Sequence, residues 1–165
     1  MSTETTATEA AAATAAAAAT AARFRVAVEA RDLAAMNDLF TEDIRFYSPV
    51  KFTPFEGRPM VLGLLNVLLR TFEDFRYVGR FDGTAETSTD GAETPSEILL
   101  FRAGVGGKEI HGIDLLQFDE AGRVKEFTVM VRPQSAVRAL GEAVFAGLVA
   151  DGLVPEPDGR PAEGR

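Results

Sequence analysis

The sequence predicts an α+β domain in which helices come first and an antiparallel sheet follows. Three observations lead to this class. Apolar residues recur at helical spacing in three segments before residue 71, and they alternate with polar residues in several segments after it. No helical pattern separates the later strands, so the βαβ alternation of a parallel sheet is excluded. A chain of 165 residues has room for one domain of ordinary size.

The folded body is expected to span residues 23–150. Residues 1–22 contain twelve alanines and are typical of a low-complexity tail, either disordered or a fraying helix. They carry no basic n-region and are too weakly apolar for a membrane span. Residues 151–165 are rich in proline and glycine, which indicates a second flexible tail.

The helical patterns occupy the first part of this body. Phe24 and Val28 belong to a helix that runs to residue 30, and Asp32 is a suitable N-cap for a second helix over residues 33–40. A short strand over residues 44–48 ends before Pro49. Pro59 suits the first turn of a third helix, whose apolar run over residues 60–69 indicates burial on most sides.

The strand patterns follow. Residues 75–81 alternate as a half-buried strand, whereas residues 84–96 are polar and do not divide into elements. From Ile98 onward we expect strand, turn at 104–107, strand over 108–118, turn at 119–122 and strand over 123–132. Pro133 ends the sheet, and Ser135 is expected to cap a last helix.

The last hairpin places a carboxylate among apolar side chains. If residues 119–122 form its loop, Asp114 lies opposite Phe127 and shares one face with Ile110, Leu116, Phe127, Val129 and Val131. His111 falls on the opposite face, so the two cannot form a metal site or an acid/base dyad. Both faces are apolar enough to need cover, and helices can cover only one. We therefore expect a homodimer that forms through the other face of the sheet.

The composition excludes several classes of function. The formal net charge is −8 and the pI is about 4.7, which disfavours nucleic acid and anionic membranes as partners. The absence of cysteine removes disulfides, thiolate metal sites and cysteine nucleophiles, and it suits a reducing cytoplasm. A single histidine leaves little scope for a metal centre. We expect no metal and no cofactor.

Asp114 is the candidate for chemistry. A carboxylate surrounded by Phe and Val is costly to ionise, so its pKa should be raised unless a cation or hydrogen-bond donors reach it. Perturbed acids of this kind gather at functional sites, yet a purely structural Asp that bonds a neighbouring hydroxyl is an equally good interpretation of the pattern.

The order of elements and the segment Gly112 to Val124 (GIDLLQFDEAGRV) resemble the nuclear transport factor 2-like superfamily. The similarity is greatest to its SnoaL-like branch, which includes polyketide cyclases and has ketosteroid isomerases as relatives. It covers roughly residues 23–131, and the segments 31–33 and 39–44 match the opening helix and strand of the family. The resemblance implies a cone of helices and curved sheet around an apolar pocket, with dimers through the sheet.

The resemblance carries the family's site over in part. Asp114 occupies the position of the protonated oxyanion-hole aspartate of ketosteroid isomerases and of the acid/base aspartate of the cyclases. The isomerases' general-base carboxylate falls on Ser48 and their oxyanion-hole tyrosine on Phe24. The cyclases' His-Trp pair is replaced by Phe127 and Thr128.

Two functions remain open from the sequence. One is a protein that holds a small apolar molecule in the pocket, without a specified activity. The other is a cofactor-independent isomerase, cyclase or hydrolase in which Asp114 moves a proton or donates a hydrogen bond to an enolate. In both, the residues expected to contact the ligand are Phe24, Phe46, Ser48, Phe127, Val129 and Val131.

Overall fold

The computed structural model describes residues 2–157, which form four helices and six strands. The helices are α1 (Ser2–Ala30), α2 (Leu33–Leu39), α3 (Arg58–Thr71) and α4 (Gln134–Ala150). The strands are β1 (Phe40–Tyr47), β2 (Phe55–Glu56), β3 (Glu73–Glu86), β4 (Glu93–Val105), β5 (Lys108–Phe118) and β6 (Val124–Arg132). The predicted α+β class is confirmed.

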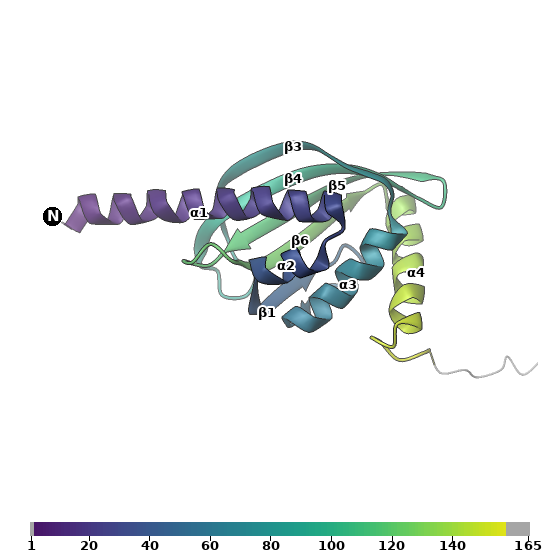
Figure 1. Cartoon of the computed structure of the whole chain (residues 1–165). Helices are drawn as coiled ribbons and strands as arrows, with labels where there is room; N and C mark the ends of the chain where they lie inside the picture. Colours follow the sequence, from purple (N-terminus) through teal and green to yellow (C-terminus); the bar gives the residue numbers. More distant parts are fainter. Residues whose placement is uncertain (1, 158–165) are drawn as a thin grey trace, which may run out of the picture.

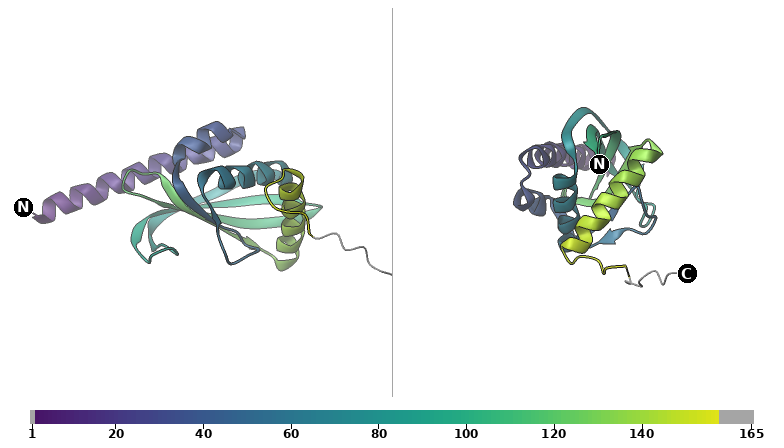
Figure 2. Two further views of the ribbon diagram at one scale, coloured as in Figure 1. Left: turned by 90° about the horizontal axis from the view of Figure 1, so that it is seen from below. Right: turned by 90° about the vertical axis from the view of Figure 1, so that its right-hand side faces the viewer.

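One curved sheet supports the whole domain. Its strand order is β2-β1-β6-β5-β4-β3, and α1, α2 and α3 cover one of its faces while α4 closes one end (Figures 1 and 2). All neighbouring strands are antiparallel except β1 and β6, which pair in parallel, so the sheet is mixed. A parallel pair requires a long connection, and here α3 and the β3–β5 meander provide it.

Local signals place several element ends as expected. Asp32 caps α2, since its carboxylate accepts a hydrogen bond from the backbone N–H of Ala35 at 3.0 Å. Pro59 lies in the first turn of α3. The expected cap at Ser135 is wrong: Pro133 occupies the N-cap position of α4, and no side chain caps this helix. Pro133 has no N–H and fixed φ, which suits the residue that ends a strand and begins a helix.

The register of the last hairpin differs from the prediction by two residues. Two steps of one residue produce this shift: Phe118 pairs with Val124 and not with Arg123, and Lys125 then forms a bulge between Val124 and Glu126, so that Asp114 pairs with Val129 and not with Phe127. Beyond the bulge the shift is two residues, which keeps those side chains on their predicted faces. Asp114 and Phe127 therefore remain on the face that the helices cover, and His111 remains on the other.

The long α1 helix includes most of the segment expected as a tail. It is continuous from Ser2 to Ala30. Its first turns are exposed and extend beyond the sheet (Figure 1), whereas Ala17 and Ala21 are buried. Small side chains allow this helix to approach the β5–β6 turn, where a Cβ on Gly122 would lie 2.8 Å from that of Ala16. Of the second expected tail, residues 158–165 lie outside the described residues.

A glycine in β5 shapes the centre of the covered face. A Cβ on Gly112 would lie 2.0 Å from Cζ of Phe101, so the ring rests directly on the glycine backbone. Phe75 stacks on the same ring with centroids 4.9 Å apart, and Phe72 packs edge-on at 5.7 Å. These contacts hold Phe101 flat against the sheet beside Asp114.

Among residues 2–157, no helix combines the length and apolarity needed to cross a bilayer.

Candidate functional site

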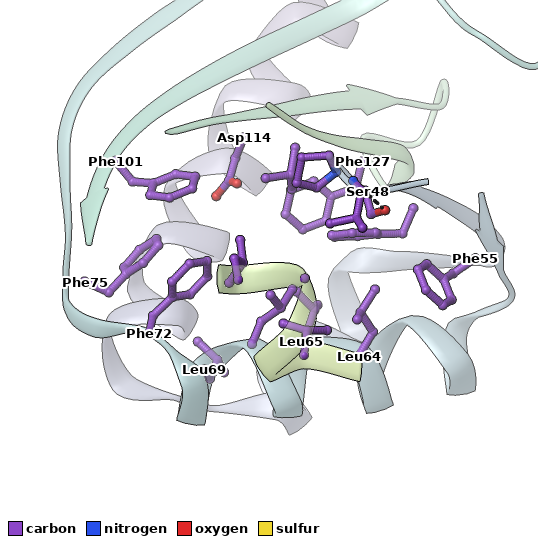
Figure 3. Close-up of a pocket in the computed structure, with 18 of the residues that line it drawn as sticks. Ser48, Phe55, Leu64, Leu65, Leu69, Phe72, Phe75, Phe101, Asp114 and Phe127 are labelled. Carbon is purple, nitrogen blue, oxygen red and sulfur yellow. Dashed lines mark hydrogen bonds between the residues drawn. The ribbon is translucent and has the colours of Figure 1, made fainter. Parts of the chain in front are cut away.

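The space between the sheet and the helices is a cavity of about 300 Å³. At about 30 Å³ per water molecule, it has the volume of roughly ten waters. The sheet forms its floor, α3 and α4 form its walls, and the loop from Ser48 to Phe55 borders it (Figure 3). The helical walls are apolar and comprise Leu64, Leu65, Leu68, Leu69, Leu140, Val144, Phe145 and Leu148.

Asp114 is the acidic residue in this lining. Its side chain projects from β5 into the space between the aromatic rings (Figure 3), and the residue is 5% exposed. The hydroxyl of Tyr77, on β3, donates a hydrogen bond to Oδ2 of Asp114 at 2.9 Å. Oδ1 accepts no hydrogen bond from any residue of the described chain. One carboxyl oxygen is thus held by the protein, and the other is left for whatever occupies the cavity.

Burial controls the protonation of this pair. Removal from water raises the pKa of Asp114 to about 7, and the hydrogen bond from Tyr77 offsets part of that rise. Burial and the adjacent Asp114 raise the pKa of Tyr77 well above its ordinary value, so its hydroxyl remains protonated. Asp114 can therefore exist as an acid and as a base near neutral pH, with Tyr77 a donor to it throughout.

Five of the six residues expected to contact a ligand line the same cavity as Asp114. They are Phe24, Phe46, Ser48, Phe127 and Val129. Val131 does not line it. Val131 pairs with Gly112, and its partly buried side chain packs against the core. Strand alternation placed it on the correct face but gave no information on how far the cavity extends along β6.

Aromatic contacts divide the cavity into two ends. At one end the rings of Phe24, Phe127, Phe46 and Phe55 form a continuous chain of edge-on contacts with centroids 4.8–6.4 Å apart. At the other end, Tyr77 contacts Phe75, which stacks on Phe101. Such pairs add about 0.5–1.5 kcal/mol each beyond the area that they bury. Asp114 belongs to the second end, through its bond to Tyr77.

The side chain of Ser48 stabilises a turn at the mouth of the cavity. Its Oγ accepts hydrogen bonds from the backbone N–H groups of Val50 and Lys51, at 3.3 and 3.2 Å. This turn fixes the start of the loop. Val50 in turn reaches α4, where a Cβ on Gly141 would lie 3.1 Å from its side chain. A serine hydroxyl is not a carboxylate base, so Ser48 lacks the group that the resemblance to the isomerases would require at this position.

Sequence reasoning missed Tyr77 and Lys51. The sequence places Tyr77 on a half-buried strand, but the segment 84–96 could not be divided, so the pairing of β3 with β4 was not predicted. Lys51 lies in an irregular loop for which no periodicity exists. His111 lies on the outer face of the sheet, away from the cavity, where its Nδ1 is 3.1 Å from Nη1 of Arg132. No group of three or more potential metal ligands occurs within residues 2–157.

Comparison with known proteins identifies a matching family and similar solved structures. Residues 21–127 match the model of the SnoaL-like domain. A crystal structure of a steroid delta-isomerase from Pseudomonas aeruginosa is 39% identical, with a TM-score of 0.73 over 85% of this chain and 96% of that chain. An uncharacterised protein with a cystatin-like fold from Silicibacter pomeroyi is 29% identical, with a TM-score of 0.71 over 81% and 88%.

More distant structures share the fold alone. A putative SnoaL-like polyketide cyclase from Shewanella denitrificans is 16% identical, with a TM-score of 0.54 over 76% of this chain and 97% of that chain. No curated protein matches significantly. The family match over most of the domain and the cone of helices on a curved sheet lead to one conclusion: the chain belongs to the SnoaL-like family, within the nuclear transport factor 2-like superfamily.

Proposed function

We propose that this protein binds a small apolar molecule with one carbonyl or hydroxyl oxygen, and that Asp114 receives that oxygen. The observation that carries the proposal is the Oδ1 of Asp114, which accepts no hydrogen bond from the described chain and faces a cavity lined mainly by apolar side chains. A ligand with a matching polar atom would gain a hydrogen bond to this oxygen, worth about 0.5–1.5 kcal/mol. An apolar pocket with a few convergent polar groups is also the usual ligand site of a protein.

The named relative supports an apolar ligand. The structure that is 39% identical is titled a steroid delta-isomerase. In this chain the walls are aliphatic and aromatic, as a fused-ring or similarly compact hydrocarbon skeleton requires. The cavity of about 300 Å³ limits the buried part of the ligand to a small molecule.

Binding in the cavity can be tested with a neutral fluorescent probe. N-phenyl-1-naphthylamine gains fluorescence when it leaves water. We expect it to bind the unmodified protein, and Leu69→Trp, which fills the cavity from α3, to weaken that binding at least about tenfold. Val26→Trp adds the same ring on the exposed face of α1, outside the cavity, and should leave binding unchanged.

The result that contradicts this proposal is specific. If Leu69→Trp and Val26→Trp bind the probe as tightly as the unmodified chain, with far-ultraviolet circular dichroism showing both variants folded, the probe is not in the cavity. An unmodified protein that gives no fluorescence increase would contradict the proposal in the same way.

A second candidate function is proton transfer within the bound molecule. The pKa of Asp114, about 7, favours it, because a base poised near neutral pH can both take and return a proton. In this reaction the ionised Oδ1 removes a proton from a carbon beside the ligand's carbonyl, and the neutral carboxyl then delivers it to another carbon of the enolate. Tyr77 holds Oδ2 in both states. The lining contains no second carboxylate, so Asp114 would perform both steps.

We also propose that the protein forms a homodimer through the uncovered face of the sheet. Met130, Ile113 and Leu100 lie in one row across β6, β5 and β4, and Leu115, Ile98 and Phe81 form the next row. Met130 is 56% exposed and Phe81 is 60% exposed. A contiguous apolar surface of this kind marks an interface, and a second copy can meet it around a twofold axis.

Light scattering checks the dimer. We expect a mass of twice 17.7 kDa at micromolar concentration, and a shift toward the monomer for Met130→Asp, which adds a charge to the centre of the interface. Val26→Asp, a matched change on α1, should retain the dimer. A monomeric mass for the unmodified chain would contradict the proposed interface.

We propose that the protein is located in the cytoplasm. The chain has no cysteine, so an oxidising compartment would give it no stabilising disulfide.

A further inference from the structure

One cation, the exposed Lys51, borders the cavity in a position that no mechanism for Asp114 uses. Of the residues that line the cavity, only Asp114 and Lys51 carry a charge. Nζ of Lys51 lies over the ring of Phe55, 3.9 Å from its centroid. Within residues 2–157, no carboxylate forms an ion pair with it. Lys108 and Lys125 form no ion pair either, so what distinguishes the exposed Lys51 is its place in the lining of the apolar cavity.

The position of Lys51 is fixed from both sides. Ser48 accepts a hydrogen bond from the backbone N–H of Lys51 itself at 3.2 Å, which sets the start of the loop. The ring of Phe55 then holds the side chain, and Phe55 packs edge-on against Phe46 of the cavity floor. The ammonium group has three N–H donors, and a ring on one side of it leaves donors free on the other sides. Lys51 therefore retains donors for an anion at the cavity mouth.

Asp114 and Lys51 lie at opposite ends of the cavity. Phe55 belongs to β2 and Asp114 to β5, and three strand-to-strand steps separate them in the order β2-β1-β6-β5. At about 4.8 Å a step, this is about 14 Å along the sheet. Figure 3 shows Phe55 and Asp114 on opposite sides of the aromatic floor. The space between them is lined by Phe46, Phe127 and the leucines of α3.

We propose that the natural ligand is an apolar acid: a compact hydrocarbon body with a carbonyl or hydroxyl oxygen at Asp114 and an anionic group, such as a carboxylate, at Lys51. This inference rests on the proposed function, because it assigns a ligand class to the same cavity. The separation of the two charged residues selects molecules whose polar ends are far apart. Neutral molecules of the same shape would occupy the cavity but lose the contact at its mouth.

Two probes with the same aromatic skeleton test the inference. N-phenyl-1-naphthylamine is neutral, and 1-anilinonaphthalene-8-sulfonate is the same ring system with a sulfonate. We expect Lys51→Gln to weaken binding of the sulfonate about fivefold and to leave binding of the neutral probe unchanged, which corresponds to a charge contact of about 1 kcal/mol. Lys51→Glu should weaken sulfonate binding further, and high salt should reduce both differences.

The control is Lys108→Gln, which removes the same charge from the exposed first residue of β5, outside the cavity lining. It should change the affinity for neither probe. If Lys51→Gln and Lys108→Gln bind the sulfonate equally, while Leu69→Trp still blocks the neutral probe, the apolar cavity remains and the anionic class is overturned. If Leu69→Trp blocks neither probe, the proposed function fails first, and the assignment at Lys51 fails with it.

Discussion

Replacing Asp114 by asparagine is expected to stabilise the protein above pH 7 by up to about 4 kcal/mol and to change little below pH 4. The pKa of this carboxyl is 3.8 in the unfolded chain and about 7 in the folded protein. The folded state thus binds the proton of Asp114 more tightly than the unfolded chain does. The stability that this proton contributes is complete below about pH 3.8 and is lost as the pH rises through 7. Each unit of difference corresponds to about 1.4 kcal/mol. Asparagine has no charge to lose.

Urea unfolding between pH 4 and pH 9 measures this effect. The free energies of unfolding of the two proteins should coincide at the acid end and separate between pH 4 and pH 7, with the variant the more stable. Glu142→Gln, on the exposed side of α4, is the matched control and should give a curve parallel to that of the unmodified chain. Parallel curves for Asp114→Asn as well would mean that the carboxyl titrates normally.

The same substitution should have the opposite effect on chemistry. If Asp114 is the base, Asp114→Asn is expected to slow proton removal about 10²- to 10⁴-fold, the usual contribution of a positioned general base. A compact ketone such as 2-decalone in deuterated buffer provides the assay, since deuterium incorporated beside the carbonyl is counted by mass spectrometry. The exchange rate with the unmodified chain should rise with pH through about 7, as Asp114 ionises.

Two results would contradict proton transfer. An Asp114→Asn variant that exchanges deuterium as fast as the unmodified chain would place the base elsewhere. An unmodified chain that exchanges no faster than buffer, while it still binds N-phenyl-1-naphthylamine, would identify a binding protein without this activity. Glu142→Gln again serves as the control and should retain the full exchange rate.

The sequence predicted which face of the sheet the side chains of β5 occupy, but it did not predict the register of β5 with β6. Alternation along β5 and β6 depends only on the period of two, so Asp114, Phe127 and Val129 were placed together correctly. The exact partners depend on the bulge at Lys125, which a chain of alternating residues does not show. The parallel pairing of β1 with β6 was also missed, since it joins segments far apart in the sequence.

The parts of the site that sequence reasoning could not reach are those that depend on tertiary contacts. Tyr77 acts through a hydrogen bond across two strands, and its partner is evident only once β4 has been placed between β3 and β5. Lys51 depends on a loop whose shape is set by the hydroxyl of Ser48. The flat packing of Phe101 on Gly112 requires both partners to be known. Local patterns contain none of this information.

The exposed first turns of α1 affect how the protein moves through solvent. Residues 3–12 are exposed, and ten residues of helix add a rod about 15 Å long to one corner of the domain. Such a projection raises the friction coefficient without adding much mass. The chain should therefore elute from a size-exclusion column ahead of a sphere of equal mass, and a second copy would carry a second rod. Elution volume alone would overstate the assembly, and sedimentation would be slower than the mass suggests.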